Sequence, residues 1–173
     1  MKRVVVTGLG AVTPIGNSVS EYMEGLQKGL SGANPITHFD ASQFKTQFAC
    51  ELKNFQPEEK VDRREMRRMD NFTIYAMYSV AEAMENSGID VEKVNVDRAG
   101  VIWGSGIGGL ATLEKEIEDH ITGSGTPRYN PFMITKMISD IAAGLISIRY
   151  GFRGANFATV SACASSSHAI GTA

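Results

Sequence analysis

The sequence predicts an α/β fold in which strands and helices alternate along the chain. Short apolar, β-branched runs end in glycine-rich turns, and segments with helical spacing of their apolar residues follow them. The 173 residues include 43% apolar and 21% charged side chains, the balance of a globular domain with its own core. We expect one domain over residues 1–173, because no internal repeat or linker interrupts the pattern.

The chain opens with a predicted buried strand at residues 4–8, which ends at a glycine. Residues 18–21 read Ser-Val-Ser-Glu, the spacing of a capping box, so a helix should start there and continue until Gly32. Residues 39–55 are expected to be extended and loop material. They contain Cys50, which we interpret as a core residue because no helix start lies beside it.

Two helices are predicted in the middle of the chain. Asp62 and Glu65 form a second capping-box pattern, here at the start of a short and strongly basic helix. A long helix follows and is closed by Gly88. Its predicted apolar face consists of Phe72, Tyr75, Ala76, Ser79, Val80, Ala83 and Met84.

Strands and helices alternate more regularly in the second half. An apolar strand at residues 99–103 leads into a glycine-rich turn at 104–109 and a polar helix at 110–120. A buried helix that ends at Gly151 is then predicted from the spacing of Met137, Ile141, Ala142, Leu145 and Ile148. A β-branched strand at residues 157–160 comes last.

The composition excludes several classes of protein. The net charge of −2 is too small to indicate a nucleic acid or an anionic membrane as partner. No apolar run approaches the ~20 residues that a membrane span requires, and the early strand leaves no room for a signal peptide. Cys50 and Cys163 do not form a disulfide framework, so a reducing cytoplasm is expected.

Cys163 is the candidate nucleophile. The last strand runs into the small-residue segment SACASSS at residues 161–167, which places Cys163 at or beside the first turn of a helix. There, unpaired backbone N–H groups and the positive end of the helix dipole favour a thiolate and can hold a developing oxyanion. The alternative interpretation is a buried small hydrophobic residue, which is what most free cysteines are.

Other motifs do not fit the functions they suggest. Residues 104–109 satisfy GxGxxG after a strand, but no second strand with an acidic end follows about 20 residues on, so we reject a dinucleotide site. The opening at residues 7–12 lacks the later glycines of short-chain dehydrogenases. The three histidines have no metal-ligand spacing with either cysteine. His168 lies roughly 140° around the helix axis from Cys163, so we interpret it as a satisfied or solvated residue.

Four motifs, spread in order over the whole chain, resemble the condensing enzymes of fatty-acid synthesis, the elongating β-ketoacyl synthases. They are KRVVVTGLGAVTPIGN, DRREMRRMDNF, GVIWGSGIGGL and TVSACASSS. The resemblance implies a thiolase-like fold, two similar halves packed in αβαβα layers, and a homodimer without a bound cofactor. This chain would be the N-terminal portion, truncated within the helix that follows Cys163.

The resemblance also implies a reaction. Cys163 would take an acyl chain from acyl carrier protein as a thioester. Malonyl carried on the phosphopantetheine of the carrier protein would then lose CO₂, and the resulting carbanion equivalent would attack the thioester to give a 3-oxoacyl chain two carbons longer.

Further site residues follow from the resemblance. Ile107 matches the residue that narrows the acyl tunnel, and Phe132 and Met133 match residues that close the tunnel of the partner subunit. The alternative for these three is ordinary apolar packing. Family members commonly have a second Phe where this chain has Met133, and Pro where it has Thr135. A flexible thioether there could change the preferred acyl length.

The basic segment corresponds to the family's docking surface for the acidic carrier protein. Arg64, Arg67 and Arg68 lie at i, i+3 and i+4 and would present one cationic stripe. Arginine forks suit carboxylate partners better than lysine point charges do. The alternative interpretation is a solvated helix face.

The family's two catalytic histidines and its lysine are expected beyond residue 173, so this piece alone should be inactive. Two other functions share parts of this pattern. A non-catalytic chain-length-factor-like partner would lack the nucleophilic cysteine. A thiolase or initiating ketosynthase would use coenzyme A thioesters, and the GSGIGG and basic-helix segments fit the elongating type better.

Overall fold

The computed structural model describes residues 3–126 and 128–173 and divides the chain into two compact units. The first contains the described residues up to Glu59 together with Tyr78–Gly88. The second contains Lys60–Met77 and Ile89–Ala173. Helix α3 (Asn71–Ser87) contributes residues to both units, and it ends before Gly88 as the sequence predicts. Gly88 has a positive φ of 64°.

The first unit contains helix α1 (Val19–Gln27), the short antiparallel strands β1 (Asn34–Pro35) and β2 (Phe48–Ala49), and a 3₁₀ turn, η1 (Pro57–Glu59). Ser18 caps α1 by accepting the N–H of Glu21, as predicted. The helix stops at Gln27, earlier than Gly32. Gly29 adopts a φ of +63°, so that the N–H of Leu30 reaches the carbonyl of Gly25, which is a Schellman ending.

Two predictions for the first unit are wrong. Residues 4–8 form no strand, and Val4 is 86% exposed. The next donors along this segment, the N–H groups of Leu9 and Ala11, bind the side chains of Asn86 and Glu82 instead of a neighbouring strand. Cys50 is exposed rather than buried, because it follows the two-residue strand β2, whose side chains have little of the unit to pack against.

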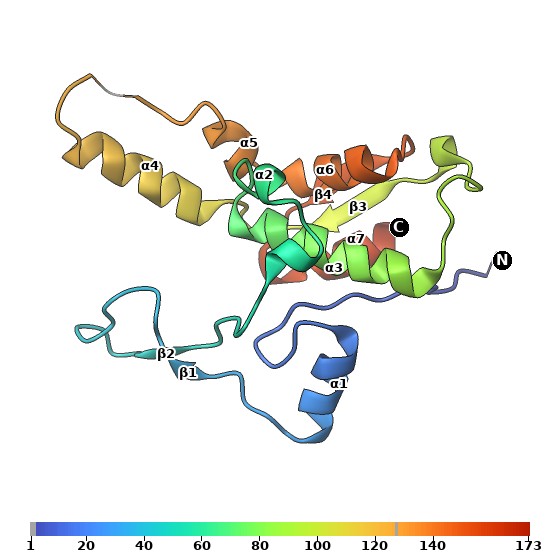
Figure 1. The fold of residues 1–173 in the computed structure, drawn as a ribbon, viewed down its shortest axis with the longest axis horizontal. Coiled ribbons are helices and arrows are strands. Elements are labelled where there is room, and N and C mark those ends of the chain that lie inside the picture. Colours follow the sequence, from blue (N-terminus) through green and yellow to red (C-terminus); the bar gives the residue numbers. More distant parts are fainter. Residues whose placement is uncertain (1–2, 127) are drawn as a thin grey trace. The chain divides into compact units, whose positions relative to one another are not determined.

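The second unit is built on two parallel strands, β3 (Val101–Gly104) and β4 (Asn156–Thr159), with Val101 opposite Asn156. Helices α6 (Ile141–Tyr150) and α7 (Ser165–Thr172) cover opposite faces of this pair (Figure 1). Helix α4 (Leu110–Thr122) packs on α5 (Met133–Met137), which contacts α6. The remaining elements are α2 (Arg63–Met66), η2 (Val96–Arg98) and η3 (Ala162–Ala164).

The buried face of α6 differs from the predicted one. The helix ends at Gly151 as expected, but it begins at Ile141, and Met137 belongs to α5. Its buried residues are Ala142, Ala143 and Ile146, whereas Ile148 is 78% exposed. The small side chains let β4 approach closely, and Asn156 of β4 donates to the carbonyl of Ala143 at 2.9 Å. Ala142 is thus buried as predicted, whereas Ile141 and Leu145 are only half-buried.

The predicted apolar face of α3 is only partly correct. Ala76 is buried as expected, but the other most buried residues are Thr73, Met77, Tyr78 and Ala81, none of which belongs to the predicted face. Within the described parts of the chain, no helix combines the length and the apolar character needed to cross a bilayer.

Candidate active site

Cys163 lies in a sharp turn between β4 and α7. It is the middle residue of the 3₁₀ turn η3, directly before α7 begins at Ser165, and it is exposed. The preceding Ala162 has a φ of +50°, a left-handed conformation that is uncommon for a residue with a Cβ. The strand-turn-helix position predicted for Cys163 is therefore confirmed, and its role as nucleophile stays a prediction.

Hydroxyl groups bind the backbone on both sides of this turn. The Ser165 hydroxyl accepts the N–H of Ser161 at 2.9 Å and donates to the carbonyl of Ala162 at 2.8 Å. The Ser161 hydroxyl lies 2.7 Å from Nδ1 of His168. This contact confirms that His168 is a satisfied helix residue. Sequence reasoning missed the two serines because runs of small polar residues carry no signal for the bonds they will form.

The glycine-rich turn at residues 104–109 packs directly against the cysteine turn. A Cβ at Gly104 would lie 2.6 Å from the Cα of Ser166, so only glycine lets α7 cross β3 this closely. A Cβ at Gly106 would lie 3.5 Å from the carbonyl oxygen of Ala162. These glycines therefore allow close backbone packing at the candidate site.

Ile107 extends from the same turn with its side chain 71% exposed. The hydroxyl of Ser139 donates to its carbonyl at 3.0 Å, and the N–H of Gly109 donates to Met137 at 2.9 Å. The turn is thus anchored to the end of α5 and to the segment that connects α5 with α6. The predicted role of Ile107 in an acyl tunnel stays a prediction, as do those of Phe132 and Met133 at the start of α5.

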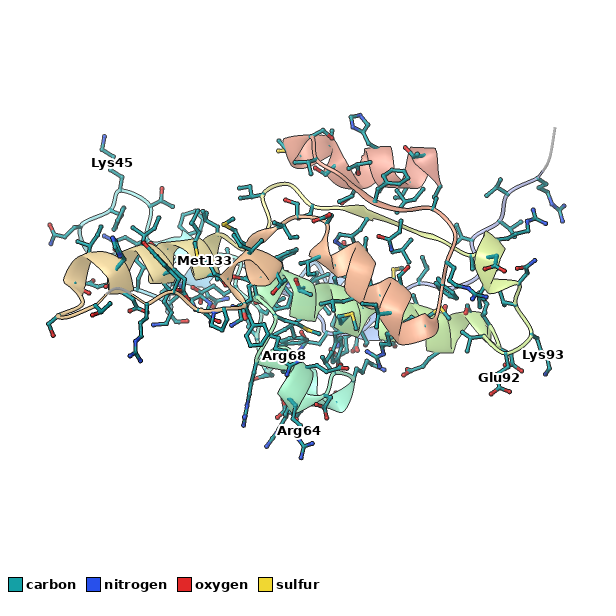
Figure 2. The ribbon with its side chains drawn as sticks, turned by 90° about the horizontal axis from the view of Figure 1, so that it is seen from above. Lys45, Arg64, Arg68, Glu92, Lys93 and Met133 are labelled. Atoms are coloured by element: carbon teal, nitrogen blue, oxygen red, sulfur yellow. The ribbon has the colours of Figure 1, made fainter. Side chains whose placement is uncertain are left out.

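A basic cleft of about 450 Å³ lies between α2, α5 and α6. Its apolar lining comprises Met69, Met77, Phe132, Ile141, Leu145 and Ile148. Three arginines, Arg64, Arg68 and Arg149, share the lining with a single carboxylate, that of Glu65. Figure 2 shows Arg64 and Arg68 beside α2 and Met133 on α5.

The cleft divides the predicted arginine stripe. Arg64 and Arg68 line the cleft, and the Arg68 guanidinium lies 5.0 Å from the centre of the Phe132 ring. Arg67 is exposed and is not among the lining residues. Arg149, which the sequence reasoning missed, comes from α6, so no spacing within the basic segment could reveal it. Among the described residues, no carboxylate lies within 4 Å of the three lining guanidinium groups.

Asp70 joins the basic segment to the glycine-rich turn. Its buried carboxylate accepts the N–H of Thr112 at 3.0 Å and the Thr112 hydroxyl at 2.5 Å, and it thereby caps the start of α4. Burial, followed by the charge of Asp70, raises the pKa of the nearby Tyr75 phenol. In the described residues, no group of three or more His, Cys, Asp or Glu side chains is placed to hold a metal ion.

The fold and the cysteine turn together define the N-terminal part of a thiolase-like condensing domain. A family model described as "Beta-ketoacyl synthase, N-terminal domain" matches residues 1–173. The chain belongs to this family.

Individual relatives agree with this assignment. The chain is 45% identical over 172 residues to 3-oxoacyl-[acyl-carrier-protein] synthase 2 of Synechocystis and 44% identical to the protein of that name from Coxiella burnetii. Each match covers 99% of this chain and 41% of the relative. A ketosynthase solved in a complex with a type II polyketide acyl-carrier protein superimposes with a TM-score of 0.81 at 28% identity, covering 100% of this chain and 46% of that one.

Proposed function

We propose that the protein containing this chain elongates acyl chains by decarboxylative condensation. Cys163 attacks the thioester of an acyl-[acyl carrier protein], the carrier's phosphopantetheine thiol leaves, and the acyl chain becomes a thioester of Cys163. Malonyl-[acyl carrier protein] then loses CO₂, and its α-carbon attacks that thioester. The products are 3-oxoacyl-[acyl carrier protein] and the free Cys163 thiol.

One observation carries this proposal. Cys163 is an exposed thiol at the junction of a strand and a helix, with small residues around it. An exposed position lets a tethered thioester approach, and backbone N–H groups at such a turn can stabilise the oxyanion that forms during acyl transfer. The names of the relatives, all 3-oxoacyl-[acyl-carrier-protein] synthases, support the choice of thioester.

Condensation itself tests the proposal. The full-length protein should convert acyl- and malonyl-[acyl carrier protein] into the 3-oxoacyl product, and Cys163→Ala should abolish this activity. Cys50→Ala is the matched control, because Cys50 is also an exposed thiol, and it should retain activity. Full activity in Cys163→Ala would refute the assignment. Product formation from coenzyme A thioesters alone would indicate a thiolase or an initiating ketosynthase instead.

We further propose that the carrier protein docks on the basic cleft and the adjoining Arg67. Three arginines without carboxylate partners in the described residues, placed around an apolar floor, suit an acidic surface that also presents apolar side chains. A ketosynthase of similar fold has been solved in a complex with its type II polyketide acyl-carrier protein, which supports a carrier protein as the partner. Arg64, Arg67 and Arg68 remain the proposed contacts, and the cleft adds Arg149.

Charge reversal tests this docking surface. Arg64→Glu combined with Arg68→Glu should weaken carrier-protein binding, most strongly at low salt, because the contact is electrostatic. Arg153→Glu, at an exposed arginine paired with Asp97 outside the cleft, serves as the control. If the affinity of the double variant for the carrier protein is unchanged at low salt, the arginines are a solvated surface and not a docking site.

The remaining assignments belong to the same proposal. Ile107 would narrow the acyl tunnel, and Phe132 and Met133 would close the tunnel of the partner in a homodimer. Cytoplasmic location is supported by two free, exposed thiols, which a reducing compartment keeps reactive.

A further inference from the structure

The turn that carries Cys163 is held in a strained shape. Ala162 has a φ of +50°, and a residue with a Cβ keeps that conformation only where surrounding interactions impose it. Residues 161–164 are otherwise exposed or half-buried, so apolar packing does little to fix them. The hydrogen bonds around the turn must therefore supply the constraint.

Ser165 provides the central constraint. The residue is 3% exposed, and its hydroxyl accepts the N–H of Ser161 while donating to the carbonyl of Ala162. The Ser165 hydroxyl thus links the N–H of Ser161 to the carbonyl of Ala162, the strained residue. The backbone carbonyl of Ser165 in turn accepts the Thr159 hydroxyl at 2.8 Å, which ties the helix start to the end of β4.

Ser161 and His168 provide a second constraint from the helix side. The Ser161 hydroxyl lies 2.7 Å from Nδ1 of His168, which is in the first turn of α7. The carbonyl of Ser161 also accepts the N–H of Ala164 at 3.1 Å. Ser161 is therefore held through its N–H, its carbonyl and its side chain, directly beside Ala162.

We propose that Ser165 and the Ser161–His168 pair are positioning residues for Cys163. They fix the backbone on both sides of the thiol, and with it the directions of the Cys163 side chain and of its N–H group. This inference rests on the proposed function, in which Cys163 accepts the acyl chain. Neither serine needs to touch the substrate. Loss of either constraint should slow acyl transfer without weakening substrate binding, because the proposed docking cleft is formed by other residues.

Four variants of the full-length protein test the inference. Ser165→Ala removes the central hydroxyl, and Ser161→Ala removes only the contact with His168. Ser161→Thr keeps a hydroxyl at that position. Ser167→Ala is the matched control, because this exposed serine on the same helix makes no side-chain hydrogen bond within the described residues. The acyl-transfer kcat and KM, and the thermal unfolding midpoint, are measured for each variant.

We expect Ser165→Ala to lower kcat about tenfold, as for the loss of a well-placed hydrogen bond. Ser161→Ala should lower it several-fold, and Ser161→Thr and Ser167→Ala should remain near the native value. KM should stay within about twofold throughout, because substrate binding is untouched. Native kcat in both Ser165→Ala and Ser161→Ala would overturn the inference. So would a loss of kcat in Ser161→Thr equal to that in Ser161→Ala.

Alkylation of Cys163 by iodoacetamide, in a Cys50→Ala background, separates this inference from the proposed function. If the native protein formed no acyl-cysteine, the proposed function would fail, but the alkylation rate would still report on the turn. Ser165→Ala should alkylate more slowly than Ser167→Ala, since the thiol is no longer held at the helix start. Equal rates in these two variants would contradict the positioning role.

The thermal unfolding midpoint identifies a variant whose fold is lost. If Ser165→Ala does not fold, the kcat and alkylation rate of Ser161→Ala, at a half-buried position, decide whether the positioning role holds.

Discussion

Individual residues at the candidate site show how little freedom its backbone has. Ala162 adopts a left-handed conformation beside Cys163, and Gly104 lets the start of α7 lie against β3. A side chain at position 104 would meet the backbone of Ser166, which cannot move without shifting the helix that follows Cys163. The position of the Cys163 thiol therefore depends on the lack of a Cβ at Gly104 in β3.

Gly104→Ala tests this dependence. The new Cβ would lie 2.6 Å from both the Cα and the N of Ser166, so the variant should lose about 1–3 kcal/mol of stability and most acyl transfer. Gly144→Ala is the matched control, because a Cβ there meets nothing within 4 Å on α6. Helix propensity predicts that this control gains up to about 1 kcal/mol. Denaturant unfolding measures both, and equal effects of the two variants would disprove the close-packing argument.

Secondary-structure elements are held by side chains from distant parts of the sequence. Helix α4 has Gly109 at its N-cap and no cap of its own, and Asp70 supplies the missing acceptor from before α3. Asp70→Ala should therefore cost about 1–3 kcal/mol, since it leaves the N–H and hydroxyl of Thr112 without this partner. Hydrogen exchange at the Thr112 amide measures the effect. Asp119→Ala, at an exposed aspartate near the end of α4, should leave that exchange unchanged.

Tyr78 makes the first unit sensitive to alkaline pH. Burial, followed by the hydrogen bond to Glu59, raises the pKa of Tyr78 to about 12. An unfolded tyrosine titrates near 10. Because the folded-state pKa is the higher one, this contribution to stability is fully present below about pH 10 and is lost as the pH rises towards 12.

Tyr78→Phe should consequently flatten the decline in stability between pH 10 and pH 12, because it removes the group whose pKa differs between the folded and unfolded states. Urea unfolding at both pH values measures the slope. Tyr129→Phe, at an exposed tyrosine, should leave it unchanged. An equally steep decline in Tyr78→Phe would show that other groups control the alkaline transition.

The elements themselves could largely be predicted from the sequence, whereas their buried faces could not. Capping at Ser18 and Asp62, and the endings at Gly88 and Gly151, follow from local chemistry that acts within a few residues. Which side of α6 faces the sheet depends on β4, whose approach is set by tertiary packing. The strand predicted at residues 4–8 failed for the same reason, since a strand requires a neighbour that local sequence does not specify.

The residues of the candidate site also differ in whether local sequence predicts them. Cys163 could be predicted because strand, turn and helix follow one another directly in the sequence. Arg149 could not, because it lies on α6, far along the chain from Arg64 and Arg68, and lines the same cleft only in the folded structure. The Ser165 bonds were equally hidden, since they depend on the strained turn at Ala162.

The chain spans 41% of the length of the curated relatives it matches. Many large apolar side chains are exposed, including Val4, Val6, Ile148, Val160 and Ile170. Such surfaces usually pack against other protein. The only histidine bonded near Cys163 in the described residues is His168, which binds Ser161.

We therefore predict that the 173-residue chain, produced alone, does not condense acyl and malonyl groups. Its CO₂ release from malonyl-[acyl carrier protein] should equal that of Cys163→Ala in the same chain. Product analysis after incubation with both carrier-protein substrates measures this. Turnover near that of the full-length protein would contradict the prediction.

Every step of the proposed condensation requires that the Cys163 thiol receives the acyl chain. Peptide mass spectrometry of the full-length protein, incubated with an acyl-[acyl carrier protein] in the absence of malonyl groups, tests this requirement. We expect the mass of the acyl group on the peptide that contains Cys163 and none on the peptide that contains Cys50. An unmodified Cys163 peptide, or an acyl group on another residue, would contradict it.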